Sequence, residues 1–376
     1  MLPSGRPLAG GHYPKSKEAL IPSSTFWRDR RVFVTGHTGF KGAWLCLWLQ
    51  LLGANVTGYA LQPPTKPSLF SGLRFGRAIR SHEGDVRDLG ALGAAMRESE
   101  PEVVLHLAAQ TIVRTSYEQP DETFSTNVLG TVNVLEAARR TGSVRSLVVV
   151  TSDKCYENRE WYWSYREKSA LGGRDPYSAS KACAELVAKS YRESYFDEMP
   201  EDERIAMATV RAGNVIGGGD WARDRIVPDT IRHLTGGTPL HLRFPNAIRP
   251  WQFVLEPLSG YLLAAERLHT EGAAFAGAWN FAPREEEAQP VGWVVERLHE
   301  AWGVPTSWLP DEGPKPHEAI YLKLDASKAR AQLGWRPRLA LEETLVWVAD
   351  WYKRVHEGAD PRAVTEEQIR RYEALA

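Results

Sequence analysis

A glycine motif of the form G-x-x-G-x-x-G constrains the fold of this chain more than any other feature. Gly36, Gly39 and Gly42 follow an apolar, β-branched run at 31–35 and lead into a helical pattern at 42–52. A strand, a glycine turn and a helix N-terminus in this order suit a dinucleotide pyrophosphate, because backbone N–H groups can approach the phosphates and the helix dipole favours negative charge. The sequence therefore predicts a nucleotide-binding strand–turn–helix unit.

Strand-like and helix-like segments alternate along the first part of the chain. The expected strands are at 31–35, 55–61, 78–82, 103–108, 146–151 and 205–211, and the expected helices are at 42–52, 89–98, 124–141 and 177–196. This alternation predicts an α/β fold with a doubly wound, Rossmann-type parallel sheet. Because the strands are almost entirely apolar, we expect helices on both faces of that sheet.

The same pattern suggests how the chain is divided. Residues 1–26, rich in Pro, Gly, Ser and Lys, are expected to form a flexible extension. Residues 27–211 should form the dinucleotide-binding domain. Beyond them, residues 212–376 contain more glycine, more proline and shorter amphipathic segments, which predicts a smaller α/β substrate-binding domain with some segments returning to the first.

Composition excludes several classes of function. The 46 Lys and Arg residues balance the 47 Asp and Glu residues, so we expect no bulk attraction to nucleic acid or to a membrane surface. The three cysteines have no metal-ligand spacing and are too few for a disulfide framework, so we predict no metal site and a reducing compartment. With no signal peptide and no apolar run long enough to cross a bilayer, the expected location is the cytoplasm.

Tyr177 and Lys181 form a second informative pattern. They are four residues apart, so their side chains share one face of the helix predicted at 177–196. Asp175 as the N-cap and Pro176 at the first helical position put Tyr177 in the first turn, near the positive end of the dipole. We expect the dipole and the ammonium to lower the phenol pKa, so that Tyr177 can accept a proton from a sugar hydroxyl. The alternative is an amphipathic helix with this spacing by chance.

Polar residues follow the apolar strand predicted at 146–151. Ser152, Asp153 and Lys154 stand where that strand ends, and open α/β sheets bind ligands at the carboxyl ends of their strands. We therefore expect these side chains in the catalytic cleft. The alternative is a turn with a local side-chain hydrogen bond, which accounts for Ser152 but poorly for the ammonium of Lys154.

With these motifs, the chain resembles the extended short-chain dehydrogenase/reductase family. Within it, the chain is similar to the NAD-dependent epimerases and dehydratases, and among those to the nucleotide-sugar 4,6-dehydratases. The resemblance runs from about residue 26 to residue 335 and is carried by segments 35–42, 106–110, 177–181, 211–221 and 249–254. Most of these dehydratases have Thr-Asp-Glu where this chain has Ser152, Asp153 and Lys154. The branch that acts on a CDP-linked hexose resembles this chain in having lysine.

The resemblance implies a hydro-lyase mechanism. NAD oxidises C4 of a nucleotide-linked hexose while Tyr177, assisted by Lys181, accepts the hydroxyl proton; water leaves across C5 and C6, and hydride returns to C6. Ser152 belongs to the catalytic set, Asp153 is the acid for the leaving hydroxyl, and Lys154 is either the C5 base or a cation that stabilises the enolate. Lys154 should lower the pKa of Asp153, whereas burial would raise it, and the sequence leaves that balance open.

The resemblance also implies which residues bind the cofactor and the substrate. The NAD contacts are Gly36, His37, Thr38, Gly39, Phe40, Lys41, Gly42, Asp85, Val86, Leu107, Ala108, Ala109, Gln110, Tyr177 and Lys181. Asp85 would bind the adenine amine, and its alternative role is a helix N-cap. The substrate contacts are Asn214, Arg249 and Trp251. Arg249 suits a diphosphate, with a surface ion pair as the alternative, and Trp251 could instead fill the core.

One departure concerns the choice between NAD and NADP. A Rossmann strand two usually ends in an acid that binds the ribose 2′-hydroxyl, but residues 55–62 contain none. No arginine stands there to favour a 2′-phosphate, although His37 and Lys41 could approach one. NAD is the expectation that the family resemblance supports.

Two other functions remain open for the sequence. A nucleotide-sugar 4-epimerase of the same fold would need Tyr177 but not the Asp153–Lys154 pair. A non-catalytic NAD(P)-sensing protein would need neither Tyr177 nor Lys181. The expected assembly is a homodimer or homotetramer, in which the helices predicted at 124–141 and 177–196 pair with those of a second copy, as the family resemblance implies.

Overall fold

The core of the protein is one parallel sheet. The computed structural model describes residues 20–313 and 319–375. Its seven-stranded sheet has the order β3-β2-β1-β4-β5-β6-β11, and every neighbouring pair is parallel. The strands are β1 (Arg31–Thr35), β2 (Asn55–Ala60), β3 (Arg80–Glu83), β4 (Val103–His106), β5 (Ser146–Val150), β6 (Ala206–Ala212) and β11 (Gly277–Phe281). The predicted doubly wound α/β fold is confirmed.

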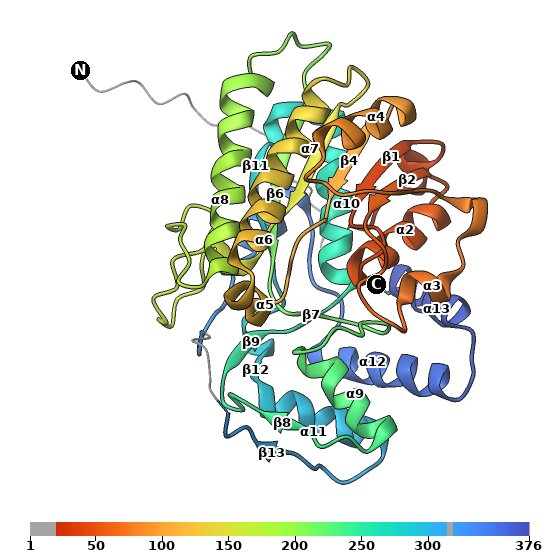
Figure 1. Ribbon diagram of the computed structural model, residues 1–376, viewed down its shortest axis with the longest axis vertical. Coiled ribbons are helices and arrows are strands. Elements are labelled where there is room, and N and C mark those ends of the chain that lie inside the picture. Colours follow the sequence, from red (N-terminus) through yellow and green to blue (C-terminus); the bar gives the residue numbers. More distant parts are fainter. Residues whose placement is uncertain (1–19, 314–318, 376) are drawn as a thin grey trace.

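Helices cover both faces of this sheet (Figure 1). One face is covered by α4 (Leu89–Ser99), α7 (Gly130–Arg139) and α8 (Pro176–Tyr191), and the other by α2 (Phe40–Leu51) and α10 (Leu255–Glu271). Along β1, the Phe33 side chain packs into the core under α4, α7 and α8. The Val32 and Val34 side chains pack into the larger core under α2 and α10. Successive side chains of a strand point to opposite faces, so an apolar strand supplies both cores.

Two helices predicted from periodicity contain an irregular turn. The segment predicted as a helix at 124–141 consists of α6 (Pro120–Phe124), a π-helical turn (Ser125–Leu129) and α7. The helix predicted at 177–196 is α8, which begins at Pro176 and continues into a second π-helical turn (Arg192–Phe196). Both α6 and α8 begin with a proline, at a position where the missing N–H of proline costs no hydrogen bond.

The segments after β6 build a lobe at the lower end of the sheet (Figure 1). It contains α9 (Ile226–Gly236), α11 (Val291–Trp302) and α12 (Leu341–His356), with α11 packed between the other two. Its short strand pairs are β7 (Val215–Ile216) with β10 (Gln252–Phe253), β8 (His241–Leu242) with β13 (Leu309–Pro310), and β9 (Ile248–Pro250) with β12 (Ala288–Pro290).

Several later segments pack against the seven-stranded sheet and the helices that cover it. β11 forms the sheet edge beside β6, in register from Gly277 opposite Ala208 to Phe281 opposite Ala212, and α13 (Pro361–Glu373) packs against α2 and α3 (Leu69–Leu73). On α10, the buried carboxylate of Glu256 accepts hydrogen bonds from the backbone N–H groups of Arg338 and Leu339, each at 2.8 Å, and from the Tyr372 hydroxyl at 2.9 Å. The chain is therefore interleaved between its two parts.

The remaining described elements are short. They are the helices α1 (Ser24–Trp27) and α5 (Val113–Glu118), the 3₁₀ turns at Gly76–Ala78, Asp153–Cys155, Gly272–Phe275 and Glu285–Glu287, and a π-helical turn at Ala329–Leu333.

The end of the expected N-terminal extension is folded. Ser23 caps α1, its backbone N–H donates to Glu266 at 2.8 Å, and the indole N–H of Trp27 donates to the same carboxylate at 2.6 Å. For residues 20–26 the structure thus differs from the predicted flexible extension, because the Trp27 side chain and the half-buried carboxylate of Glu266 fix this segment on α10. Residues 1–19 lie outside the described part of the chain.

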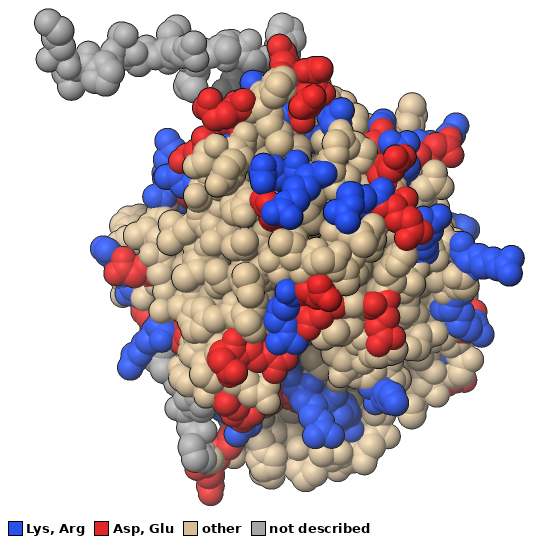
Figure 2. Space-filling view, turned by 45° about the horizontal axis from the view of Figure 1, so that its top comes forward, with Lys and Arg blue, Asp and Glu red and all other residues tan. Residues whose placement is uncertain are grey.

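Charged side chains are spread over the surface. On the face drawn in Figure 2, basic and acidic side chains lie interspersed, in keeping with a formal net charge of −1. Within the described ranges, the helices are too short or too polar for any of them to cross a membrane. Anion binding by this chain therefore depends on local groups of basic residues rather than on the field of the whole molecule.

Candidate active site

The glycine loop between β1 and α2 forms a cradle that only glycine can line. Gly36 has a φ of +73°, and a Cβ built there would lie 2.7 Å from the backbone nitrogen of Ala108. A Cβ on Gly42 would collide with the carbonyl oxygen of Gly36. Gly39 is the N-cap of α2 and brings no side chain to its N–H groups, which leaves those donors for an anion. The cradle fits the pyrophosphate of a dinucleotide.

Two side chains of this loop leave the cradle in different directions. The His37 ring packs under Gly58 and shares a 2.7 Å hydrogen bond with Ser81, and burial lowers its pKa to about 4. Lys41 points into a cavity, where its Nζ lies 3.4 Å from the Tyr261 hydroxyl, and burial, with the nearby charge of Lys181, lowers its pKa to about 7. Lys41 thus lies on the cavity side of the loop and away from the end of β2, and His37 is a buried neutral ring.

An acid does lie at the end of β2, although β2 does not supply it. Glu83, the last residue of β3, accepts a hydrogen bond from the side chain of Gln62, which follows β2. Parallel pairing of β2 and β3 brings the two residues together. The sequence pattern did not single out Glu83 because that pattern looks for an acid on the second strand only.

Asp85 and Val86 lie after β3. The Asp85 carboxylate forms a 2.6 Å ion pair with Arg87, whose hydrogen bonds hold the pKa of Asp85 below its usual value. The N-cap of α4 is Asp88, which accepts from the backbone N–H of Ala91 at 3.0 Å. The capping role considered for Asp85 is therefore wrong. Val86 is buried, and its side chain packs against the backbone of α7 at Gly130.

The loop after β4 is held against both the glycine loop and α8. The backbone N–H groups of Leu107 and Ala108 donate to the Thr35 hydroxyl, each at 3.2 Å. Gln110 donates its backbone N–H to Asn127 at 2.8 Å, and the Asn127 amide donates to the Ser180 hydroxyl at 2.9 Å. Ala109 lines the cavity. These bonds give Asn127 the structural role of joining the loop to α8.

Tyr177 and Lys181 lie on α8 and face the cavity. As predicted, Asp175 caps this helix by accepting from the Ser178 backbone N–H at 2.9 Å. The Lys181 ammonium donates to the Val150 carbonyl at 3.3 Å. The predicted lowering of the Tyr177 pKa is wrong for the protein without ligands: burial raises it to about 12, against the weaker opposing effect of the Ser152 hydroxyl. Desolvation outweighs the helix dipole at this depth.

The turn after β5 carries Ser152, Asp153 and Lys154. The Ser152 hydroxyl accepts from the Lys154 backbone N–H at 3.2 Å, so the local turn considered for Ser152 is present, and it also donates to Oδ1 of Asp153 at 2.9 Å. Asp153 is 4% exposed, and its Oδ2 has no partner in the described part of the chain. Burial raises the pKa of Asp153 despite the charge of Lys154. The sequence left open whether the Lys154 charge or burial determines the direction of the Asp153 pKa shift, and burial has the larger effect.

One cavity joins these catalytic candidates to the C-terminal lobe. Its volume is about 520 Å³, and its walls include Ser152, Asp153, Lys154, Tyr177, Lys181, Asn214, Arg249 and Trp251. Arg249 is 3% exposed and donates to the Ile248 and Ile320 carbonyls, so it is not the surface ion pair considered above. Trp251 is buried and still forms part of the wall, with its indole N–H donated to the Gln289 carbonyl at 2.8 Å.

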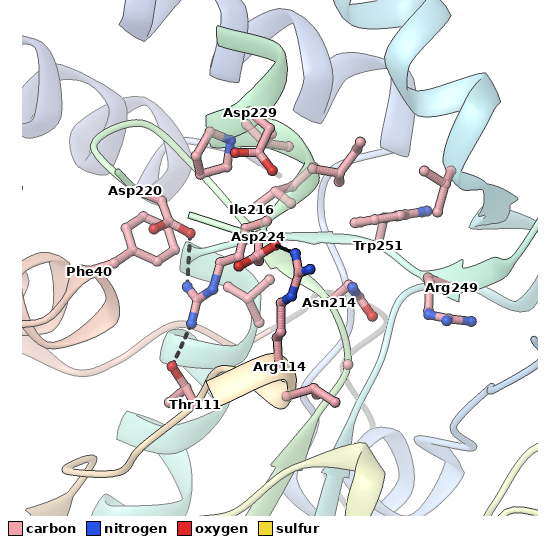
Figure 3. A pocket seen from close by; sticks show the side chains of 18 of the residues that line it. Phe40, Thr111, Arg114, Asn214, Ile216, Asp220, Asp224, Asp229, Arg249 and Trp251 are labelled. Atoms are coloured by element: carbon pink, nitrogen blue, oxygen red, sulfur yellow. Dashed lines mark hydrogen bonds and ion pairs between the residues drawn. The ribbon is translucent and has the colours of Figure 1, made fainter. Parts of the chain in front are cut away.

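Charged residues that the sequence analysis did not single out also line this cavity, among them Arg114, Asp220 and Asp224 (Figure 3). Arg225 pairs with Asp220 at 2.9 Å and donates to Thr111 at 2.8 Å. Asp224, at a φ of +60°, pairs with Arg114 and with Arg243, each at 3.3 Å. The dense charges at 220–229, directly after a glycine run, were the signal that could have identified this part of the cavity. Basic residues outnumber acidic ones along its walls, which suits an anionic ligand.

This arrangement defines a class of protein: a nicotinamide-dependent enzyme whose cofactor and substrate meet at the carboxyl end of a doubly wound sheet. The family follows from the sequence match. The chain belongs to the NAD dependent epimerase/dehydratase family, whose model matches residues 32–276.

Individual relatives are similar over most of the chain. CDP-glucose 4,6-dehydratase of Salmonella typhimurium (strain LT2) is 53% identical over 348 residues, which cover 92% of this chain and 97% of that protein. dTDP-glucose 4,6-dehydratase of Streptomyces antibioticus is 30% identical, covering 73% and 77%. The crystal structure of a Streptomyces venezuelae dTDP-glucose 4,6-dehydratase with NAD bound matches with a TM-score of 0.73 at 23% identity, covering 88% of this chain and 99% of that one. That last match shows the fold alone.

Proposed function

We infer that this chain is a hydro-lyase that uses NAD to dehydrate CDP-glucose to CDP-4-keto-6-deoxyglucose. The observation that carries this function is the common cavity of Asp153, Tyr177 and Lys181, in a chain that is 53% identical to a CDP-glucose 4,6-dehydratase. Oxidation at C4 needs a proton acceptor beside the nicotinamide, and loss of water needs an acid beside the same sugar. The cavity supplies both.

When bound, NAD⁺ would supply the hydride acceptor for C4 of the hexose and, once reduced, the hydride donor for C6. To hold the cofactor, the loop at 36–42 and the first turn of α2 offer backbone donors to the pyrophosphate. Asp85 and Val86, which follow β3, are proposed to hold the adenine, and the segment 107–110, which is hydrogen-bonded to Thr35 at the end of β1, is proposed to contact the nicotinamide half. These contacts are proposals that rest on the cradle geometry.

Tyr177 accepts the proton of the C4 hydroxyl as the carbon is oxidised. Since burial raises the pKa of Tyr177 to about 12, this transfer requires a nearby positive charge. Lys181, one helical turn away on the same face of α8, provides one. The Lys181 pKa, lowered by burial to about 8, still leaves the amine mostly charged at neutral pH.

Asp153 protonates the C6 hydroxyl as it leaves, and Ser152 holds the carboxyl group in place. A raised pKa keeps a carboxylic acid protonated closer to neutral pH, as a general acid requires. Lys154, on the same 3₁₀ turn, lines the cavity. It either removes the C5 proton or stabilises the enolate that forms when this proton is lost.

Asn214, Arg249 and Trp251 are proposed to bind the nucleotide part of the substrate. All three line the cavity and come from segments that follow β6 (Figure 3). The guanidinium of Arg249 suits a diphosphate. The preference for cytidine rests on the similarity to the Salmonella typhimurium enzyme.

Product analysis tests this function. Incubation of the protein with NAD⁺ and CDP-glucose should yield a sugar with the alkaline absorbance of a 4-keto group and a C6 methyl signal by NMR. A 4-epimerase would instead yield CDP-galactose, with no loss of water. A sensor protein would bind NAD and leave every hexose nucleotide unchanged.

We further propose a homodimer or homotetramer in the cytoplasm. Large apolar side chains are exposed on neighbouring helical segments: Phe124, Leu129, Leu186 and Tyr195 are 38–56% exposed. Leu186 lies on α8 and Leu129 on the π-helical turn that packs against it. A contiguous apolar surface of this kind is typical of an interface. Pairing of these helices with those of a second copy would cover it.

A further inference from the structure

Behind the catalytic cavity, one carboxylate collects four hydrogen bonds. Glu185 of α8 accepts from the hydroxyls of Thr151 at 2.5 Å and Thr209 at 2.7 Å. It also accepts from Arg211, through Nε at 2.7 Å and Nη2 at 2.6 Å. The side chains of Glu185 and Arg211 are each 3% exposed. The ion pair is buried, bidentate and completely satisfied on its acidic side.

Arg211, the basic partner of Glu185, extends this hydrogen-bond network to Tyr156, which follows the catalytic turn Asp153–Cys155. The third guanidinium nitrogen of Arg211 donates to the Tyr156 hydroxyl at 2.7 Å, and the guanidinium carbon lies 4.9 Å from the centroid of the Tyr156 ring. The Tyr156 hydroxyl in turn donates to Asn280 of β11 at 2.7 Å. Tyr156 is therefore fixed by a cation, a hydrogen bond and the edge strand of the sheet.

These contacts bracket the turn that carries the proposed acid. Thr151 immediately precedes Ser152, and Tyr156 immediately follows the 3₁₀ turn Asp153–Cys155. Glu185 itself lies one helical turn beyond Lys181 and two beyond Tyr177, on the same face of α8. A single ion pair thus connects both ends of the turn to the helix that carries the oxidation machinery.

We propose that Glu185 and Arg211 are positioning residues that fix the catalytic turn relative to α8, so that elimination of water keeps pace with oxidation at C4. The proposal deepens the dehydratase function and rests on it. Neither residue lines the cavity, so neither touches the substrate. Their effect is transmitted through Thr151 and Tyr156.

A gain in folding stability does not by itself explain the buried ion pair of Glu185 and Arg211. A buried ion pair loses hydration on both partners, and well-packed apolar residues are often as stable in its place. Directional bonds, however, fix the geometry, and a misplacement of about 1 Å in an active site can slow a reaction about 100-fold. Glu185 also opposes the burial that lowers the pKa of Lys181. The Glu185 carboxylate therefore acts both on the turn Asp153–Cys155, through Thr151, and on the charge of Lys181.

Two threonines allow a matched test. Thr151→Val and Thr209→Val each remove one hydroxyl from the same carboxylate, but only Thr151 adjoins the catalytic turn. With CDP-glucose and NAD⁺, we expect Thr151→Val to form product about 10- to 100-fold more slowly and to accumulate reduced nicotinamide, because the oxidised sugar waits for elimination. Thr209→Val should lose a similar amount of thermal stability, yet keep a near wild-type rate and no such accumulation.

Two further variants make the result decisive. Thr151→Ser restores the hydroxyl and should restore the rate, and Tyr156→Phe, which loosens the other end of the turn, should again accumulate reduced nicotinamide. Two outcomes would overturn the positioning role and leave the dehydratase function standing. In the first, Thr151→Val and Tyr156→Phe slow product formation only as much as their lower Tm explains. In the second, Thr209→Val slows product formation as much as Thr151→Val does. If the unmodified protein forms no 4-keto product from CDP-glucose, the proposed function itself fails.

Discussion

The hydroxyl of Ser152 binds only one of the two carboxyl oxygens of Asp153. It donates to Oδ1 at 2.9 Å, and Oδ2 is buried without a partner among the residues that the structure describes. A buried carboxylate oxygen without a hydrogen-bond partner is costly when charged, so burial favours the protonated form despite the nearby charges of Lys154 and Arg249. Asp153 is therefore prepared to carry a proton on the oxygen that Ser152 does not bind.

Replacing that acid should separate the two halves of the reaction. In Asp153→Asn, Tyr177 and Lys181 remain, so oxidation at C4 should persist, whereas loss of water should slow by roughly 100- to 10,000-fold, the usual contribution of a general acid. Reduced nicotinamide measured by absorbance, together with the 4-keto product measured by NMR, reports each half. An unchanged rate of product formation would remove Asp153 from the mechanism and favour an epimerase.

The glycine cradle predicts a selective loss of cofactor binding. In Gly36→Ala the new Cβ would meet the backbone of Ala108, and the residue would be held at a φ of +73°, which is strained for any side chain. We expect NAD⁺ binding, measured by calorimetry, to weaken at least 10-fold. The control is Gly142→Ala, an exposed glycine with nothing within 4 Å of its Cβ position. Equal affinity in both variants would contradict the cradle.

Asp224 should compete with the substrate for arginines. It pairs with Arg114 and Arg243 on the wall of the cavity, and a diphosphate would seek the same guanidinium groups. Asp224→Asn should therefore tighten the binding of CDP by up to about 5-fold, the range of partly exposed ion pairs, and the gain should shrink as salt rises. Asp350→Asn, which removes a carboxylate paired with Arg354 on α12, serves as control. Weaker binding in Asp224→Asn would show instead that Asp224 orients the arginines for the nucleotide.

Glu256 should make stability depend on pH. Burial raises its pKa from 4.5 to about 7, so between these values the folded protein binds more protons than the unfolded chain, and stability falls as pH rises through this window. A shift of that size corresponds to about 3 kcal/mol. In Glu256→Gln, the decline in Tm between pH 5 and pH 8 should be smaller than in the unmodified protein. Glu201→Gln, at an exposed position, is the control. If Tm falls equally with pH in Glu256→Gln and in the unmodified protein, Glu256 does not have this role.

The exposed apolar side chains of the helices predict how copies associate. Leu186 on α8 is 56% exposed, and Leu186→Lys would place a charge in the proposed interface. We expect this variant to sediment as a smaller species than the unmodified protein in analytical ultracentrifugation, with an unchanged circular dichroism spectrum. Leu309→Lys, at a position that is 53% exposed in the C-terminal lobe, should leave the assembly intact. A monomeric unmodified protein would end the proposal.

Local patterns predicted the sheet well, and they predicted which loops and helix carry the candidate catalytic residues. The strands at 31–35 and 146–151 are almost continuous apolar runs, and the Asp175–Pro176 pair marks the start of α8. Such features depend on neighbours in the sequence, so the sequence displays them. The catalytic turn after β5 could be placed for the same reason, since parallel strands bring their carboxyl ends to one edge.

Features that depend on tertiary contacts could not be predicted in this way. The Tyr177 pKa was expected to fall, yet it rises, because its sign depends on how deeply the phenol is buried. The pairing of Asp224 with Arg114 joins residues 110 positions apart, and Glu83 reaches the end of β2 only because β2 and β3 pair. None of these relationships leaves a periodic signal in the sequence.

The place of β11 limits how this protein can be recombined with its relatives. In the sequence that strand lies between segments of the lobe, since α9 precedes it and α11 and α12 follow it, yet it completes the sheet edge beside β6 and supplies Asn280 to the network around Tyr156. A chimera joined once, after β6, would exchange the C-terminal lobe together with an edge of the host's own sheet. Grafting the lobe of a relative therefore needs two exchanged segments, one from β7 to β10 and one from β12 to α12, with the recipient keeping its own α10 and β11.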